Sequence, residues 1–260
     1  MTTPKATDKK RNARGRFRLP DPPEREPDDM TSFDQLSATG NVRYLALHLG
    51  NQDTTLVAGE HYLVVRPTRS LAGSRYPDLL IAFGVDPAAY KESNGYIIDE
   101  QGKPPDFVLE IASARTGALD TREKREDYQR LGITEYWRFD ETGRHHGVRL
   151  AGDRLVEGKY EPVPIQELED DTLQGYSRVL DLHIRWERGS LAWYDPATRR
   201  HIPTYEDERA RADAERARAD AENVRAEAER EARLEERATR VRTEARVAEL
   251  EDELRRLRGP

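Results

Sequence analysis

The pattern of apolar and polar positions divides the chain into three stretches. Residues 1–30 are rich in Lys, Arg, Pro and Asp and have almost no large apolar side chains, which is typical of a segment that cannot bury enough surface to fold. Residues 31–203 mix aromatic, β-branched and turn residues over a length sufficient for one buried core. Residues 204–260 are almost entirely Ala, Glu, Arg, Asp and Leu. We therefore predict a disordered tail at 1–30, a folded domain at 31–203 and a long helix at 204–260.

Within the middle stretch the apolar pattern alternates between the period of a helix and that of a strand. Helical spacing predicts helices over 31–49 and 120–131, the second ending at Gly132. Apolar runs predict strands of a continuing sheet, with the first run a strand or a hairpin, over 55–67, 77–84, 96–99, 106–112 and 135–140. A second set of mainly antiparallel strands follows over 146–203. This order predicts an α/β fold: a mixed-sheet core with few helices, followed by the long C-terminal α-helix.

The C-terminal stretch repeats every seven residues, since 208–214 is followed by the closely similar 215–221. Its apolar seam is mostly alanine and shifts register along the chain. Alanine seams bury little area, so two interpretations stay open. The helix at 204–260 is either a weak coiled coil that joins a second copy or a partner protein, or a solitary helix stabilised by charge pairs such as Glu229 with Arg233.

The composition excludes several kinds of site and partner. The absence of cysteine excludes disulfides and thiolate metal sites, and the six histidines do not form zinc-ligand spacings. No apolar stretch reaches the roughly 18 residues of a membrane span and no secretory signal is present, so we expect a cytoplasmic protein without a membrane partner. The net charge of -7 means that a nucleic-acid partner would need a local basic patch.

One acidic residue, Glu110, lies inside an apolar strand. Its charge is costly to bury unless a cation or a hydrogen-bond network compensates it. Asp78 opens a neighbouring buried strand, and Lys124 lies on the helix that follows Glu110. Two carboxylates on neighbouring strands make an oxygen site suited to Mg²⁺, with Mn²⁺ as a substitute. An ammonium group beside such a site suits phosphate chemistry.

Five motifs occur in an order and spacing that resemble a known family. They are Tyr76-Pro77-Asp78-Leu79-Leu80, the run from Pro105 to Ser113, Asp120-x3-Lys124-x3-Tyr128, Leu131-Gly132-Ile133, and Glu135 to Asp140. Over about 31–203 the chain resembles the Uma-two family of bacterial endonucleases, within the PD-(D/E)xK, or restriction-endonuclease-like, superfamily. The Ala/Glu/Arg-rich C-terminal helix is similar to tails on one branch of that family.

The resemblance implies roles for particular residues. It makes Asp78 and Glu110 the catalytic metal ligands, with the backbone carbonyl of Ile111 contributing, and Lys124 the catalytic lysine. The superfamily usually places its lysine two residues after the acid, where this chain has Ala112. The resemblance implies that the lysine has moved to the next helix, so the expected site depends on Lys124 reaching Glu110.

The candidate residues also have structural interpretations. Asp78 could cap a turn after Pro77. Glu110 could form a buried ion pair with an arginine, and Lys124 could pair with an acid on its own helix. The arginines in question are Arg115 and Arg122, and the acids are Asp120 and Asp127.

Four further residues are weaker candidates. Asp106 faces the same way as Glu110, but four residues along a strand span roughly 13 Å, so it is a secondary candidate only. Tyr128, one turn after Lys124, either packs against the sheet or lines the site. His145 and His146 lie beside a turn, where we predict that both are exposed to solvent.

Two functions from different classes follow. The first is a Mg²⁺-dependent endonuclease that hydrolyses phosphodiester bonds in DNA. The alternative is a catalytically inactive scaffold that acts through protein–protein contacts of its C-terminal helix. A nuclease needs cationic side chains around its acidic pocket. The arginines that flank the motifs are Arg75, Arg115, Arg122 and Arg125.

Overall fold

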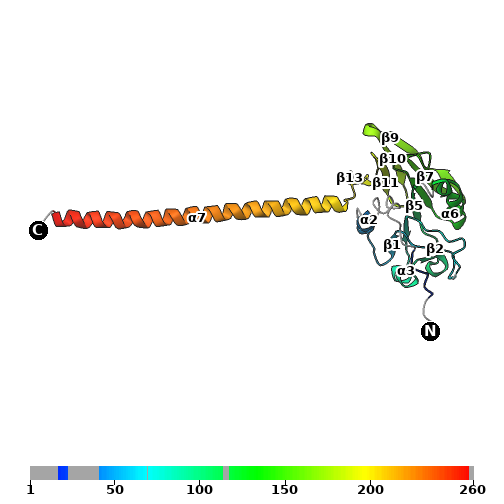
Figure 1. Cartoon of the computed structure of the whole chain (residues 1–260), viewed down its shortest axis with the longest axis horizontal. Helices are drawn as coiled ribbons and strands as arrows, with labels where there is room; N and C mark the ends of the chain where they lie inside the picture. The colour runs from blue at the N-terminus through cyan, green and yellow to red at the C-terminus, as the bar shows by residue number, and fades with distance from the viewer. Residues whose placement is uncertain (1–16, 23–40, 69, 114–116, 258–260) are drawn as a thin grey trace, which may run out of the picture. The chain divides into compact units, whose positions relative to one another are not determined.

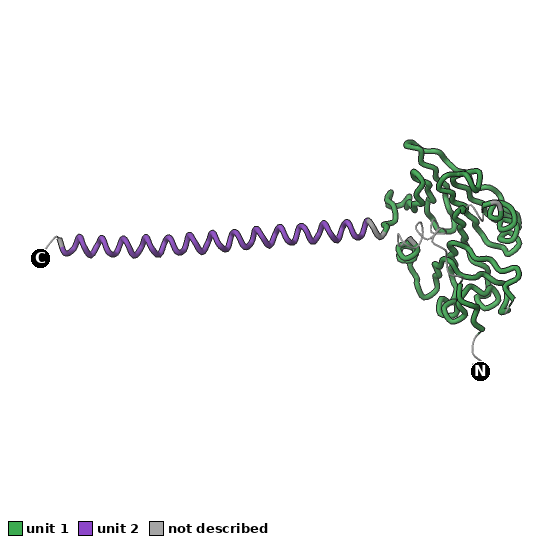
Figure 2. Tube along the Cα trace, viewed as in Figure 1, with its two compact units in different colours: residues 1–205 green, residues 206–260 purple. Residues whose placement is uncertain are grey.

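A computed structural model describes residues 17–22, 41–68, 70–113 and 117–257. The chain divides into two compact units, 1–205 and 206–260, which Figure 2 distinguishes by colour. Most of the predicted tail at 1–30 and the first part of the predicted helix at 31–49 lie outside the described residues.

The described part of unit 1 is organised around a six-stranded mixed sheet in the order β1-β3-β5-β6-β7-β8. Its strands are β1 (Thr55–Ala58), β3 (Leu79–Phe83), β5 (Phe107–Ile111), β6 (Glu135–Phe139), β7 (Leu150–Val156) and β8 (Lys159–Pro162). The central pair β5–β6 is parallel and the other pairs are antiparallel. The predicted mixed α/β fold is therefore confirmed.

A second, five-stranded sheet in the described residues is antiparallel throughout, in the order β13-β12-β11-β10-β9. Its strands are β9 (Ile165–Leu168), β10 (Thr172–Ser177), β11 (Leu182–Glu187), β12 (Ser190–Asp195) and β13 (Arg200–His201). The antiparallel character predicted for 146–203 is confirmed, although β7 and β8 join the first sheet.

Two strands pair differently from the prediction. β2 (Leu63–Val64) and β4 (Tyr96–Ile97) form a separate two-stranded parallel sheet. The hairpin alternative for 55–67 is wrong, because β1 pairs with β3 while β2 pairs with β4. The expectation that 96–99 continues the main sheet is wrong for the same reason, since a short apolar run does not encode its partner.

The helices of unit 1 are short. They are α2 (Asn41–Leu49), α3 (Pro87–Ser93), α4 (Ile98–Gln101), α5 (Gly117–Leu119), the π-helical turn η3 (Asp120–Lys124), α6 (Arg125–Leu131) and the 3₁₀ turn η4 (Glu169–Asp171). Helix α6 ends at Gly132, which has φ 81° in the left-handed region, as predicted. Helix α3 was not anticipated; Asp86 begins it by accepting hydrogen bonds from two backbone N–H groups.

Strand β5, labelled within unit 1 in Figure 1, is buried along its whole length, and its two faces belong to different cores. Phe107, Leu109 and Ile111 pack in a cluster with side chains of the second sheet such as Trp193. Val108 points the other way, into a cluster that contains five tyrosines. Glu110 alternates with Leu109 and Ile111 along the strand and therefore shares the Val108 face.

Residues 17–22, within the stretch predicted to be a disordered tail, pack against the domain. Leu19 is buried with Val64 and Ile97. Its backbone N–H donates to the carbonyl of Ser93, and the side chain of Asn94 donates to the carbonyl of Pro20. Phe17 packs against the same cluster, so two apolar side chains and these hydrogen bonds dock the segment.

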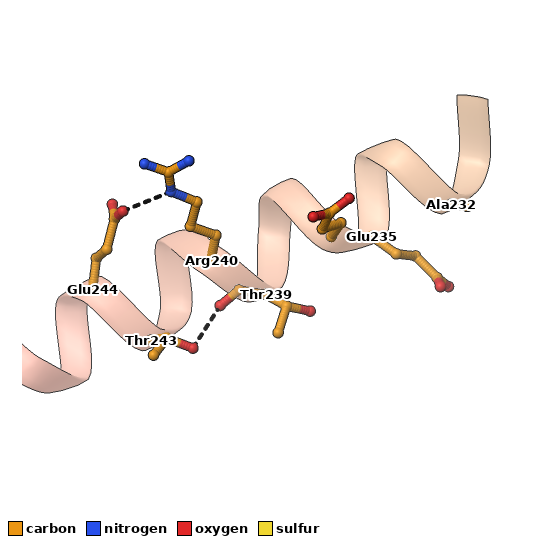
Figure 3. A pocket seen from close by; sticks show the side chains of 7 residues that line it. Ala232, Glu235, Thr239, Arg240, Thr243 and Glu244 are labelled. Carbon is orange, nitrogen blue, oxygen red and sulfur yellow. Dashed lines mark hydrogen bonds and ion pairs between the residues drawn. The ribbon is translucent and has the colours of Figure 1, made fainter. Parts of the chain in front are cut away.

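Unit 2 contains the helix α7 (Tyr205–Leu257), so the predicted C-terminal helix is confirmed. Figure 3 shows one stretch of its surface, where Arg240 Nε donates to Glu244 and the Thr243 hydroxyl donates to the carbonyl of Thr239. Its apolar side chains are exposed, Leu234 by 66% and Leu254 by 51%. Among the described residues, no helix combines the length and hydropathy needed to cross a membrane.

Candidate active site

Two carboxylates meet where β3 begins beside β5. Leu79 pairs with Leu109 in the antiparallel register, so the next position along places Asp78 opposite Glu110. Directly opposite residues have Cβ atoms about 5 Å apart on the same face. Asp78 Oδ2 accepts a hydrogen bond of 2.7 Å from the backbone N–H of Ile111. Asp78 is half-buried, while Glu110 is 1% exposed.

Lys124 reaches this pair from the next helix. Its Nζ lies 2.8 Å from Glu110 Oε2 and 2.8 Å from Asp120 Oδ1. The structure thus brings Glu110 and Lys124 into contact, although Ala112 occupies the position where the superfamily usually has its lysine. The buried cation facing Glu110 is this lysine. Of the two arginines considered as alternatives, Arg122 is exposed and Arg115 lies outside the described residues.

Tyr128 completes the contacts of Glu110. Its hydroxyl donates a 2.5 Å hydrogen bond to Glu110 Oε1, so the two Glu110 oxygens have different partners. The Tyr128 ring also packs edge-on against Tyr136, with centroids 5.0 Å apart. Tyr128 therefore both packs against the sheet and lines the site, and the two interpretations of this residue do not exclude each other.

Asp120 and His146 belong to the same cluster. His146 Nε2 lies 3.0 Å from Asp120 Oδ2, and both side chains are fully buried. The prediction that His146 is exposed is wrong, whereas His145 is exposed as predicted. The loop after β6 turns His146 inward because the Asp140 carboxylate accepts hydrogen bonds from backbone N–H groups along the loop, including that of His146 itself.

A π-helical turn carries two of these side chains. Asp120 opens η3 and Lys124 ends it, four residues apart, and their side chains meet at 2.8 Å. Single π turns inside α-helices occur frequently at functional sites. The hydroxyl of Tyr136 donates to the backbone carbonyl of Asp120 over 2.9 Å, which ties the beginning of the turn to β6.

The electrostatics of the cluster follow from its burial. Burial raises the pKa of Glu110 to about 8; the charge of Lys124 opposes this rise and that of Asp78 adds to it. Burial also acts to raise the pKa of Asp120, but the hydrogen bond from His146 and the charge of Lys124 outweigh it and lower that pKa. The two carboxylates raise the pKa of Lys124 in spite of its burial. Lys124 is therefore charged at neutral pH.

Asp106 lies outside this cluster. Its carboxylate accepts 2.7 Å hydrogen bonds from Lys103 Nζ and a 2.8 Å hydrogen bond from the backbone N–H of Phe83. These contacts fasten the beginning of β5 to the end of β3. Asp106 is a positional residue in this structure, and the contacts give it no part in the site.

The flanking arginines are largely occupied elsewhere. Arg75 pairs with Asp127 on α6. Arg125 pairs with Asp153 at 2.8 Å and donates to the carbonyl of Tyr160. Arg122 is exposed and thus available to a solvent-side ligand. Arg138 lies opposite Glu110 on β6, but its guanidinium pairs with Asp153 at 2.8 Å, whereas Lys124 contacts the Glu110 carboxyl group itself.

The donor set fits a divalent cation of the magnesium type. Within the described residues no three His, Cys, Asp or Glu side chains converge on one point, so a site rich in protein ligands is absent there. Magnesium binds through one or two carboxylates and keeps several waters. Asp78 and Glu110 provide two carboxylates, and each carboxylate has lone pairs beyond those that accept the hydrogen bonds described. Burial raises the pKa of Glu110 and the charge of Asp78 adds to the rise, and a cation between the two carboxylates would oppose both effects.

Fold and site together define a mixed α/β protein in which two strand-borne carboxylates meet a lysine from the following helix. The chain belongs to the Uma2 family, whose model is described as "Putative restriction endonuclease" and matches residues 41–185. A solved structure, described as a putative nuclease belonging to DUF820 from Anabaena variabilis, is similar over 56% of this chain and 73% of its own, with 14% identity and a TM-score of 0.34. No curated protein matches the chain.

Proposed function

We propose that the protein is a Mg²⁺-dependent endonuclease that hydrolyses phosphodiester bonds in DNA. The observation that carries the proposal is the contact between Lys124 Nζ and Glu110 Oε2, at 2.8 Å, on a strand face where Asp78 stands opposite Glu110. Membership of the Uma2 family, whose model is described as "Putative restriction endonuclease", supports the same class of reaction.

In the proposed reaction, water adds across one phosphorus–oxygen bond, so that one strand end keeps the phosphate and the other gains a hydroxyl. A cation held by Asp78 and Glu110, with the Ile111 carbonyl, would offset the negative charge that develops on the phosphate. Lys124 provides a fixed positive charge at the same place, and Tyr128 fixes the orientation of Glu110 through its hydroxyl.

Cleavage assays on plasmid and single-stranded DNA, with Mg²⁺ or Mn²⁺, test the proposal. We expect Glu110→Ala, Asp78→Asn and Lys124→Ala each to lower the cleavage rate by about 100-fold or more. Asp106→Asn is the matched control, because this acid lies near the same strands but pairs with Lys103. Its rate should stay within about threefold of the parent. Absence of cleavage by the parent with either metal would overturn the proposal, and equal cleavage by parent and variants would overturn the site.

The exposed apolar side chains of α7 favour a second candidate, a scaffold that associates with another copy through this helix. Val224, Leu234 and Val241 are 58–66% exposed, and Val247, Leu250 and Leu254 are 43–51% exposed. Sedimentation equilibrium of the full chain tests it. Leu250→Glu with Leu254→Glu should convert a dimer to a monomer, while Thr243→Glu should not. A parent protein that is monomeric at high concentration would contradict this candidate.

A further inference from the structure

A buried chain of contacts leads from His146 through Asp120 to Lys124. His146 Nε2 lies 3.0 Å from Asp120 Oδ2, and Asp120 Oδ1 lies 2.8 Å from Lys124 Nζ. The side chains of His146 and Asp120 are fully buried, and that of Lys124 is 13% exposed. His146 lies outside all five sequence motifs.

The two carboxylate oxygens of Asp120 contact different residues, Lys124 and His146. A lysine stem has many rotamers, and holding it in one of them costs conformational entropy. Lys124 is held because two carboxyl oxygens lie 2.8 Å from the same Nζ, one from strand β5 and one from its own helical turn. The second Asp120 oxygen is bound by His146, so the carboxylate cannot rotate without losing one of its two partners.

The position of His146 is itself fixed by the loop that follows β6. Asp140 accepts hydrogen bonds from the backbone N–H groups of His145 and His146, at 2.7 and 2.8 Å. The loop also lies directly against the beginning of the helix, since a Cβ on Gly117 would stand 2.6 Å from the carbonyl oxygen of His145. Only a glycine at 117 allows this approach.

The tautomer of His146 follows from its surroundings. Asp120 is a carboxylate with a lowered pKa, so the Nε2 that faces it carries the proton and donates. The other ring nitrogen, Nδ1, is buried and has no hydrogen-bond partner among the described residues.

We propose that Asp120 and His146 are positioning residues, which hold the Lys124 ammonium against Glu110. Neither is proposed to touch the substrate; His146 acts through Asp120, and Asp120 acts through Lys124. The expected effect on cleavage rests on the proposed endonuclease function, while the positioning itself does not.

The positioning is measured without any reaction by nuclear magnetic resonance of the lysine ζ-ammonium groups. The chain has seven lysines, so the ¹H–¹⁵N spectrum is sparse, and Lys124→Arg assigns the signal of Lys124. We expect a signal protected from exchange with water in the parent protein. Asp120→Asn should shift this signal and speed its exchange about tenfold or more, because the charged acceptor is lost. The signal of Lys103, which pairs with Asp106, is the internal reference and should not move.

A pair of substitutions at His146 separates positioning from filling of space. His146→Gln retains a donor near the place of Nε2, whereas His146→Leu has a similar size and no donor. We expect His146→Leu to reproduce the Asp120→Asn spectrum and His146→Gln to restore most of the parent signal. Asp127→Asn and His145→Gln are matched controls from the same helix and the same loop, and should leave the Lys124 signal unchanged. A Lys124 signal that is the same in parent, Asp120→Asn and His146→Leu would overturn the proposal.

Steady-state kinetics on DNA supply the second readout. A positioning role predicts that kcat falls about 100-fold in Asp120→Asn while KM stays within about threefold, since a displacement of a reacting group by about 1 Å has an effect of this size. A folded Asp120→Asn protein with the parent kcat would contradict the proposal. If the parent protein cleaves no DNA, the endonuclease assignment fails, and the lysine spectra alone decide whether Asp120 and His146 hold Lys124.

Discussion

Two charge pairs in this chain have the same sequence spacing and nearly the same length. Asp120 and Lys124 are four residues apart and meet at 2.8 Å in unit 1; Arg240 and Glu244 are four residues apart and meet at 2.9 Å in unit 2. The side chains of the first pair are 0% and 13% exposed, and those of the second are 79% and 63% exposed. The sequence spacing of a charge pair therefore does not indicate its role, and the burial of the side chains distinguishes the two pairs.

The two pairs also differ in how much they contribute to stability. An exposed pair on a helix contributes about 0.3–0.5 kcal/mol, because water screens it and long side chains must be ordered. Removing one partner of a buried pair leaves an uncompensated charge, which costs about 3–5 kcal/mol. In the proposal above, the buried pair of unit 1 holds the Lys124 ammonium beside Glu110, whereas the exposed pairs of α7 add only a small stabilisation to a helix in water.

The largest expected effect is that of Lys124→Met. It leaves Glu110 and Asp120 buried without their common cation, so we expect the free energy of unfolding of unit 1 to fall by about 3 kcal/mol or more. Trp137, Trp186 and Trp193 all lie in unit 1, so urea unfolding followed by tryptophan fluorescence reports on this unit. Arg240→Met is the control and should leave the fluorescence midpoint unchanged. Equal urea midpoints for Lys124→Met and Arg240→Met would show that the buried pair stabilises the protein no more than the exposed pair does.

The second effect is a dependence of stability on pH. The pKa of Glu110 lies at about 8 in the folded chain, against 4.5 for a free side chain, so the folded state binds more protons between these values. This contribution to stability is full below pH 4.5 and is lost as the pH rises through 8. Without added metal, we expect the free energy of unfolding to fall by on the order of 2–4 kcal/mol over this window.

Glu110→Gln should remove that slope, since the amide does not titrate. Asp120 acts in the opposite sense: its pKa is lowered, so its contribution is lost only as the pH falls below the ordinary range of a carboxyl group. Urea titrations of the parent and Glu110→Gln at pH 5 and pH 8.5 make the measurement. Parallel pH profiles for the two proteins would show that Glu110 ionises normally.

A smaller effect is expected from a single hydroxyl. Tyr128→Phe removes the 2.5 Å hydrogen bond to Glu110 Oε1 and leaves a buried carboxylate oxygen without its donor, at a cost of about 1–3 kcal/mol. Tyr176→Phe is the exposed counterpart, because the Tyr176 hydroxyl donates to Asp181 at the surface. Its effect should be within about 0.5 kcal/mol. Thermal unfolding of both variants measures the two losses of stability. A similar loss in Tyr128→Phe and Tyr176→Phe would weaken the contrast between buried and exposed groups.

The smallest effect is in α7. Arg240→Ala should lower the circular-dichroism signal at 222 nm only slightly, since one exposed pair contributes about 0.5 kcal/mol at most. Raising the salt concentration to about 1 M shortens the Debye length to about 3 Å and should weaken all the α7 pairs together. The fluorescence transition of unit 1 should not show a matching loss. A loss of stability with salt that is larger in unit 1 than in α7 would contradict the assignment of buried charge pairs to unit 1 and exposed pairs to α7.

Much of the fold is predictable because it depends on local patterns. Alternation along β5 separates Val108 from Phe107 and Leu109, and Gly132 marks the end of α6. The pairing of strands is not local, and therefore the parallel β2–β4 pair was not predicted. Leu19 shows the same limit, since its docking site is formed by residues far along the chain.

The residues of the candidate site likewise divide into those that the sequence predicts and those that only the tertiary structure reveals. Asp78, Glu110 and Lys124 come from motifs, and the spacing of Asp120 from Lys124 was visible in the sequence as a pair on one helix. Nothing near His146 indicates that it is buried, because its position depends on Asp140 folding the loop inward and on Gly117 leaving room for it. A histidine beside a turn is normally a surface residue, and only the tertiary structure reveals otherwise.

The π-helical turn at Asp120–Lys124 has a consequence for how the sequence can change. Such a turn corresponds to an α-helix with one residue added, and one residue rotates a helix by about 100°. The wider π turn absorbs that residue, so Lys124 and Tyr128 keep about the rotational position relative to Gly117 that an α-helix one residue shorter would give them. A deletion within Asp120–Lys124 that restores a regular α-helix therefore leaves the two ends of the helix in phase, whereas an added residue would rotate Lys124 away from Glu110. A one-residue deletion in this segment should accordingly be tolerated better than a one-residue insertion.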